Sequence, residues 1–154
     1  MDVRFQAEGI KFNFRAAGIL IEKNHVLLHK QKEDHYWALP GGGIELGERS
    51  RDAVVREFEE ELGCTCHVKG LPWIAENFFT YKDIQMHEVG FYYVLEAEES
   101  YFREDSFHGL EGERLVYRWV PLSAIYEYPV LPGFLPAGLQ HIPRVTEHLI
   151  MEEK

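Results

Sequence analysis

Three glutamates in the middle of the chain have a spacing that suits a metal ion. Glu57, Glu60 and Glu61 lie in a segment, residues 50–62, whose apolar positions recur with the period of an α-helix. Side chains three and four positions apart are neighbours on a helix, so the three carboxylates share one patch. Like charges repel at that distance, and a hard cation such as Mg²⁺, which prefers oxygen ligands, turns the repulsion into affinity. For an arbitrary glutamate-rich helix, however, a solvated acidic face is the commoner explanation.

The ends of this helix are predicted from capping residues. Ser50 is a suitable N-cap, and Asp52 suits the first turn because the helix dipole favours negative charge there. Gly63 can adopt the left-handed conformation that closes a helix. The predicted apolar face consists of Val54, Val55, Phe58 and Leu62.

A longer pattern of fixed spacings, residues 42–64, favours the metal-binding interpretation. It reads glycine, five residues, glutamate, seven residues, and then Arg-Glu-hydrophobic-x-Glu-Glu-x-Gly-hydrophobic, from Gly42 to Cys64. Every defined position is matched. The segment resembles the Nudix box, and residues 37–42 resemble the strand and turn that lead into it. The chain is thereby identified as a member of the Nudix family, similar to the MutT-like pyrophosphohydrolases.

This resemblance implies the activity and the metal ligands. Nudix hydrolases cleave a nucleoside diphosphate linked to another moiety, and they use Mg²⁺ or Mn²⁺. The resemblance maps the metal ligands onto Glu57, Glu60 and Glu61, and adds a backbone carbonyl at Gly41, where a missing Cβ allows close approach. A metal-bound water is more acidic than free water, so a further carboxylate can take its proton. The candidates for this base are Glu57, Glu111 and Glu113, and Glu111 is also a candidate metal ligand.

Arg56 receives a different role from the resemblance. Family members use this arginine to hold a glutamate of the box, and its planar fork of donors suits that task. Glu48 is either its partner or an outer metal ligand. Orientation of the carboxylates, rather than direct chemistry, is therefore the expected contribution of Arg56 to catalysis.

Substrate contacts have to come from outside the box. Arg15 and Lys30 are the basic residues expected to meet phosphate, whereas Lys32 is as easily an ordinary surface charge. Phe79 and Tyr81 are candidates for stacking on a base; Phe91 and Tyr93 are also considered, although strand aromatics more often belong to the core. Tyr81 lies 17 residues after Cys64, and dinucleoside polyphosphate hydrolases have a tyrosine near that distance. The alternatives to the predicted pyrophosphohydrolase are such a dinucleoside polyphosphate hydrolase, a non-catalytic nucleotide-sensing module, and an isoprenoid diphosphate isomerase of the same superfamily.

Composition limits the class of protein and its partners. The 154 residues are expected to form one domain, and 45% apolar and 14% aromatic residues exclude disorder. The formal net charge of −10 argues against binding to duplex nucleic acid or to an anionic membrane. A small anionic nucleotide substrate then requires a local basic patch or a metal ion. Homodimerisation is common in the family, but no feature of the sequence fixes it.

Two cysteines and the N-terminus indicate the compartment. Cys64 and Cys66 are two positions apart, and side chains that alternate along a strand would keep their sulfurs from bonding. Small buried thiols in a reducing compartment are the expectation. The N-terminal segment has no basic-then-apolar leader and no apolar run long enough to span a bilayer. A cytoplasmic enzyme is therefore predicted.

The remaining segments predict an α+β fold. Residues 98–113 read as a loop, a short helical turn follows residue 121, and a terminal helix is expected within residues 137–153. The family resemblance implies an α/β/α sandwich with a mixed sheet between helices. Strands are predicted at residues 3–7, 12–21, 26–29, 36–39, 66–79, 87–97 and 115–120.

Overall fold

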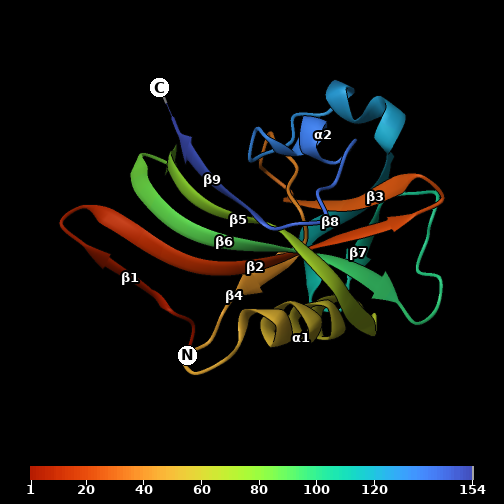
Figure 1. Cartoon of the computed structure of the whole chain (residues 1–154), viewed down its shortest axis with the longest axis horizontal. Coiled ribbons are helices and arrows are strands. Elements are labelled where there is room, and N and C mark those ends of the chain that lie inside the picture. The colour runs from red at the N-terminus through yellow and green to blue at the C-terminus, as the bar shows by residue number, and fades with distance from the viewer. Residues whose placement is uncertain (154) are drawn as a thin grey trace.

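The chain folds around one mixed β-sheet of nine strands, seen in a computed structural model that describes residues 1–153 (Figure 1). The strand order is β7-β8-β3-β2-β6-β5-β9, and β1 and β4 also pair with β2. The elements are β1 (Arg4–Ala7), β2 (Ile10–Glu22), β3 (His25–Gln31), β4 (Gly41–Gly43), α1 (Ser50–Leu62), β5 (Cys66–Tyr81), β6 (Ile84–Ala97), β7 (Phe107–Gly109), β8 (Gly112–Pro121), the 3₁₀ helix η1 (Leu122–Glu127), α2 (Leu135–Gly138) and β9 (Glu147–Glu152).

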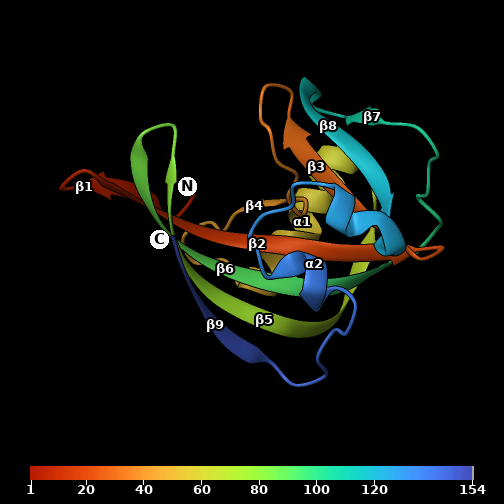
Figure 2. The ribbon, with the colours of Figure 1, turned by 90° about the horizontal axis from the view of Figure 1, so that it is seen from above.

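The sheet opens between β2 and β3. These strands pair only near their connecting turn, at Ile21↔Val26 and Glu22↔His25. Beyond that point β3 continues alongside β8, whereas β2 runs parallel to β6 and antiparallel to β4. Figure 2 shows the two groups of strands diverging from this turn.

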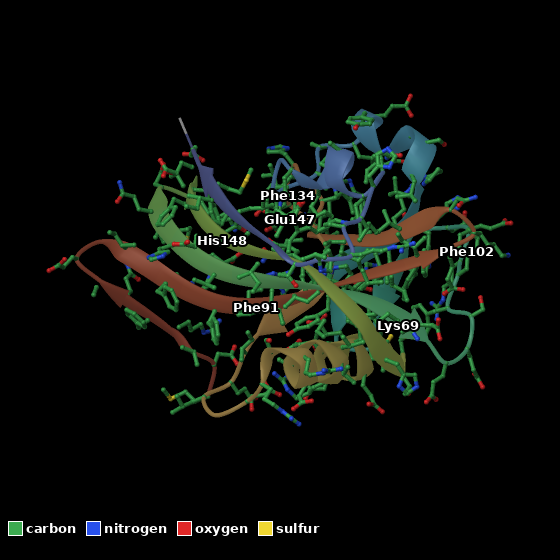
Figure 3. All side chains as sticks on the ribbon, in the orientation of Figure 1. Lys69, Phe91, Phe102, Phe134, Glu147 and His148 are labelled. Carbon is green, nitrogen blue, oxygen red and sulfur yellow. The ribbon has the colours of Figure 1, made fainter. Side chains whose placement is uncertain are left out.

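Helices cover the two faces of the sheet, which confirms the predicted α/β/α arrangement. Helix α1 lies on one face and η1 and α2 on the other (Figure 1). Figure 3 labels a side chain in each layer: Phe91 packs against the core beside α1, and Phe134 packs against the core beside α2. Among residues 1–153, no helix has the length and apolar character needed to cross a membrane.

Helix α1 has the predicted extent but a different N-terminus. Gly63 closes it in the left-handed conformation, with φ 65° and ψ 20°, as expected. The predicted N-cap is wrong: Arg49 occupies the N-cap position and makes no side-chain cap bond. Ser50 is the first helical residue, and its hydroxyl lies 2.5 Å from that of Tyr93 on β6. A bond to the sheet has thus replaced the local cap.

The prediction of a terminal helix is also wrong. Within residues 137–153, α2 ends at Gly138 and β9 forms a parallel pair with β5, from Trp73↔Glu147 to Phe78↔Glu152. Without β9 the outer edge of β5 would carry unpaired backbone donors and acceptors, and pairing satisfies them. Two smaller differences concern residues 36–39, which form isolated bridges rather than a strand, and the predicted loop 98–113, which contains β7.

The two cysteines are free and buried, as expected, but they do not point apart. Cys64 lies before β5 and Cys66 begins it, and their sulfurs are 3.5 Å apart. Residues two apart on a strand share a face, so alternation along the strand does not separate these two sulfurs. The free thiols nevertheless agree with the prediction that no disulfide joins them.

Candidate active site

A cavity of about 670 Å³ occupies the space where β2 and β3 diverge. One wall is the face of β2, β5 and β6 opposite α1, and another is β3. The three glycines of β4 line an edge of the cavity. Glu57 and Glu61 reach the cavity from α1 past this edge. The cavity therefore brings together acidic groups from the helix and groups from the sheet.

Glu57 and Glu61 share one side of α1, as expected for positions four apart. Burial raises the pKa of Glu61 to about 7; the nearby carboxylate of Glu57 adds to this, while a hydrogen bond from the Tyr117 hydroxyl, at 3.1 Å, opposes it. Burial also raises the pKa of Glu57, and Arg56 opposes that shift. Two such carboxylates held together at a cavity wall are an unfavourable arrangement that a cation would relieve.

Arg56 binds the carboxylates around it, although its contribution to catalysis stays a prediction. Its Nε and Nη2 donate to the two oxygens of Glu48, at 2.8 and 2.9 Å, and its Nη1 donates to Glu57 at 3.0 Å. Nη2 also donates to the carbonyl of Gly43, at 3.2 Å. Glu60, whose side chain is 53% exposed, accepts from Nη1 at 3.2 Å. One guanidinium thus connects α1, β4 and the loop that carries Glu48.

The glycines of β4 allow the close contact between strand and helix. A Cβ on Gly42 would lie 2.5 Å from Cδ of Glu57 on the helix, and one on Gly41 would overlap the carbonyl oxygen of Ala16 on β2. Neither position can accept a side chain in this arrangement. Glu57 is therefore held directly against the backbone of β4.

The backbone of β4 also directs carbonyl groups toward the helix side. Gly18 donates to the carbonyl of Pro40 at 2.9 Å, and antiparallel pairs alternate between bonded and unbonded. The carbonyls of Gly41 and Gly43 consequently point away from β2, and that of Gly43 accepts from Arg56. The Gly41 carbonyl lies on the same edge of β4. A backbone oxygen is thus available beside the acidic groups.

The family model of the NUDIX domain matches residues 12–139 of the chain. The chain belongs to the Nudix family. The cavity, the carboxylates of α1 and the glycine edge are formed by the Nudix box and the strands that surround it. The sequence-based family prediction is confirmed.

Curated relatives and solved structures agree with membership of the Nudix family. The chain is 35% identical over 83 residues to an ADP-ribose pyrophosphatase of Methanocaldococcus jannaschii, a match over 52% of this chain and 48% of that protein. It is 31% identical over 118 residues to the uncharacterized Nudix hydrolase YvcI of Bacillus subtilis, over 75% and 70% of the two chains. A MutT protein of Bacillus halodurans superposes with a TM-score of 0.63 at 24% identity, over 88% and 89% of the chains, which shows a shared fold.

A shorter match links the chain to a third curated relative. It is 44% identical over 82 residues to an RNA pyrophosphohydrolase of Ruthia magnifica, over 49% of this chain and 44% of that protein. The chain thus spans less than half the length of this relative and of the archaeal one.

All four residues predicted to bind substrate line the cavity between β2 and β3. Arg15 on β2 donates to the carbonyl of Leu39 at 2.7 Å, and Lys30 on β3 lies 5.3 Å from the ring centroid of Trp37. The predicted positions lining the wall are Arg15, Lys30, Phe79 and Tyr81. The Tyr81 hydroxyl donates to Asp34 at 3.2 Å. The chain therefore places basic and aromatic groups in the cavity that contains the acidic ones.

The other candidates lie elsewhere. Phe91 and Tyr93 pack in the core beside α1, and neither lines the cavity, nor does Lys32. Glu111 lies in the turn between β7 and β8, which is fixed to the helix because Leu110 N donates to the backbone carbonyl of Glu61 at 2.7 Å. Glu111 shares a small recess with Glu61, and Glu113 does not line it.

His29 is a residue of the site that sequence analysis missed. It lies on β3, lines the cavity and is only 7% exposed, and its Nδ1 has no hydrogen-bond partner. Burial lowers its pKa to about 3, and Arg15 and Arg114 contribute, so the ring is neutral at physiological pH. No local pattern distinguishes this histidine from the other seven, because its position depends on pairing between β3 and β8.

The oxygen donors at the helix edge of the cavity fit a divalent cation. Among residues 1–153, no three Asp, Glu, His or Cys side chains converge as a metal site, and Glu60 bonds to Arg56. Glu57, Glu61 and the Gly41 carbonyl lie at one edge, and all present oxygen, which suits Mg²⁺ or Mn²⁺. Glu60 lines neither the cavity nor the recess that Glu111 shares with Glu61, and both glutamates stay candidate ligands.

Replacing Arg56 with lysine is expected to destabilise the protein by about 1–2 kcal/mol, because a single ammonium cannot make the paired bonds to Glu48 or reach Glu57 at the same time. Chemical denaturation should show the loss. Arg51→Lys is the matched control, because Arg51 is exposed on the same helix. Equal stability of the two variants would contradict the structural role given to Arg56.

The raised pKa of Glu61 predicts how pH affects metal binding. Its folded pKa of about 7 exceeds the ordinary value of 4.5, so its contribution to stability is complete below about pH 4.5 and is lost as pH rises through 7. A cation must displace this proton, so the apparent affinity for Mg²⁺ should rise about tenfold per pH unit up to about 7 and then level off.

Metal-dependent melting at several pH values measures this affinity. Glu61→Gln should reduce the pH dependence, because glutamine has no proton to displace; the raised pKa of Glu57 leaves the remainder. A wild-type affinity that is constant between about pH 5 and 8 would contradict the prediction.

Proposed function

We propose that the chain is a Mg²⁺- or Mn²⁺-dependent pyrophosphohydrolase that cleaves a nucleoside diphosphate linked to another moiety. The observation that supports this most strongly is that Glu57 and Glu61 line the same cavity as Arg15 and Lys30. Acidic groups suit a metal ion, and basic groups suit the phosphates that the metal would contact. A pyrophosphate bond placed between them would meet both sets of groups.

In this proposal the cation is held by Glu57, Glu60, Glu61 and the Gly41 carbonyl, with Glu111 as a further candidate. When bound, it supplies a Lewis acid and an acidified water. Arg56 keeps Glu57 in place, and Arg15 and Lys30 orient the phosphates. Glu57 or Glu111 accepts the proton of the attacking water, and Phe79 and Tyr81 contact the nucleoside. The same proposal includes a cytoplasmic location; a homodimer stays a prediction from the family.

The names of the relatives support the class of reaction and leave the substrate open. One is described as an ADP-ribose pyrophosphatase, one as an RNA pyrophosphohydrolase and one as a putative 8-oxo-dGTP diphosphatase. These names have in common a pyrophosphatase or diphosphatase activity on a nucleotide-type compound. We carry only that common chemistry to this chain.

A substrate panel tests the proposal. It should include ADP-ribose, a UDP-sugar, 8-oxo-dGTP and a dinucleoside tetraphosphate, each with Mg²⁺, with Mn²⁺ and with a chelator. Hydrolysis of at least one compound that stops with chelator is the expected result, and preference for the tetraphosphate would favour the dinucleoside polyphosphate alternative. Nucleotide binding without hydrolysis would instead identify a sensing module and contradict the proposal.

A further inference from the structure

The sheet wall of the cavity carries three rows of side chains that run across the strands. Because alternate residues of a strand share a face, every second position of β2, β6 and β5 lies on the face of the sheet that bears the cavity. The register between these strands aligns the positions side by side. The rows are Arg15, Gly90 and Ala75, of which only Arg15 lines the cavity; then Asn13, Glu88 and Asn77; then Lys11, Met86 and Phe79, all of which line it.

The rows follow one another away from the metal-binding edge. Arg15 pairs with Gly43 of β4, and its charge lowers the pKa of Glu61, so the first row is the nearest to the acidic edge. Two residues of a strand span about 7 Å, so each row lies about that far beyond the last. Moving away from that edge, the wall therefore presents first the positive charge of Arg15, then a purely polar row, and then a row dominated by the apolar Met86 and Phe79.

Glu88 is the unexpected member of the middle row. It lines a cavity proposed to bind an anion, where a carboxylate repels phosphate. Burial raises the pKa of Glu88, while Arg15 and a hydrogen bond with Asn13 lower it. A carboxylate in this place is favourable only if the ligand presents hydrogen-bond donors to it, and the amides of Asn13 and Asn77 add both donors and acceptors.

Hydroxyl groups of a sugar have this chemistry, because each can donate to a carboxylate and accept from an amide. The position also fits, since the sugar of a nucleotide lies between its phosphates and its base. The row of Met86 and Phe79 beyond it offers the apolar surface that a base requires. A base edge with two donors would match Glu88 but would leave the apolar row without a partner.

We propose, building on the proposed function, that Asn13, Glu88 and Asn77 bind the vicinal hydroxyl groups of a ribosyl ring adjacent to the diphosphate. The site then selects ribonucleotide-type substrates over deoxyribonucleotides. None of these three residues belongs to the Nudix box, so the selectivity is a property of the sheet wall. A site built to bind a hydroxyl discriminates strongly against the analogue that lacks it.

Binding of adenosine diphosphate and of its 2′-deoxy, 3′-deoxy and 2′,3′-dideoxy forms tests the inference. Binding is measured by calorimetry in the presence of Ca²⁺, which limits turnover. Wild-type protein should bind adenosine diphosphate at least about tenfold more tightly than the dideoxy form, with the single deoxy forms between them. Glu88→Gln should reduce this ratio to less than about threefold, without weakening the dideoxy form, because the carboxylate repels phosphate.

Glu76→Gln is the matched control, because Glu76 lies on β5 beside Asn77, points to the opposite face and bonds to His148. It should keep the wild-type ratio. Asn13→Ala is the second variant in case Glu88→Gln folds poorly, and it should reduce the ratio in the same direction. Melting curves establish that each variant is folded.

The outcomes separate this inference from the proposed function. If wild-type protein binds adenosine diphosphate and its dideoxy form with equal affinity, the inference is overturned even if the substrate panel is hydrolysed. The same holds if Glu88→Gln changes the preference for guanine over adenine nucleotides and leaves the affinity ratio between the sugar forms unchanged. Sugar discrimination without any hydrolysis would support the ribose site and overturn the proposed function. Failure to bind any of the four nucleotides would overturn the inference, whereas the proposed function is decided by the substrate panel alone.

Discussion

Replacing Glu57 or Glu61 with glutamine is expected to lower kcat at least about a hundredfold, which corresponds to a loss on the order of 3 kcal/mol of transition-state stabilisation. Each substitution keeps the shape of the side chain and removes a charged oxygen from the cavity edge. The fold should survive, because both carboxylates have raised pKa values from burial and the substitution removes an unfavourable buried charge. Steady-state kinetics with saturating Mg²⁺ measures the effect.

Glu59→Gln is the control for this comparison. Glu59 is exposed on the same helix and does not line the cavity, so the variant has the same change in net charge without the change in the site. It should turn over like wild type. Wild-type turnover in Glu57→Gln and Glu61→Gln as well would refute the assignment of the helix carboxylates to metal binding.

The second large effect is expected at Glu111. Glu111→Gln should lower the maximal rate strongly, by about tenfold to a hundredfold, while metal-induced stabilisation stays nearly intact. The turn that carries Glu111 is fixed to the helix by the bond from Leu110 to Glu61, so this carboxylate lies beside the acidic edge. Glu57→Gln should impair rate and metal-induced stabilisation together, because Glu57 is proposed as a metal ligand.

Glu113→Gln serves as the comparison for the loop acids. Glu113 is exposed at the start of β8 and lines neither the cavity nor the recess beside Glu61. Its replacement should leave rate and melting behaviour unchanged. If Glu111→Gln also keeps the wild-type rate, Glu57 becomes the better candidate for the base.

The helix and the family were predictable because their signals are local. The positions of Glu57 and Glu61 relative to each other follow from helical geometry alone, and Gly63 ends the helix by its own conformational freedom. The fixed spacing of the Nudix box identifies the family. The long strands were also found, since runs of β-branched and aromatic residues mark them.

The errors arose where distant parts of the chain decide the outcome. Residues 147–152 have no strong strand signal of their own, and they become β9 because the edge of β5 offers backbone partners 74 positions earlier, as in Trp73↔Glu147. Ser50 fits the N-cap pattern, but its hydroxyl is hydrogen-bonded to that of Tyr93 on β6. Local patterns carry no information about these partners.

The cavity wall was only partly predictable for the same reason. Arg15 and Lys30 were selected by charge, and both line the cavity. His29 and Glu88 were missed because burial and strand register, rather than neighbouring residues, give them their environment. Such residues become visible only when the sheet is assembled.

A titration with Mn²⁺, followed by electron paramagnetic resonance of the free ion, tests most directly whether the helix carboxylates form the metal site. Wild-type protein and Glu59→Gln are compared with the double variant Glu57→Gln/Glu61→Gln, all without nucleotide. Saturable binding to the first two proteins, weakened at least about tenfold in the double variant, is the predicted result. Binding of equal strength in all three would contradict a metal site at the cavity edge of α1.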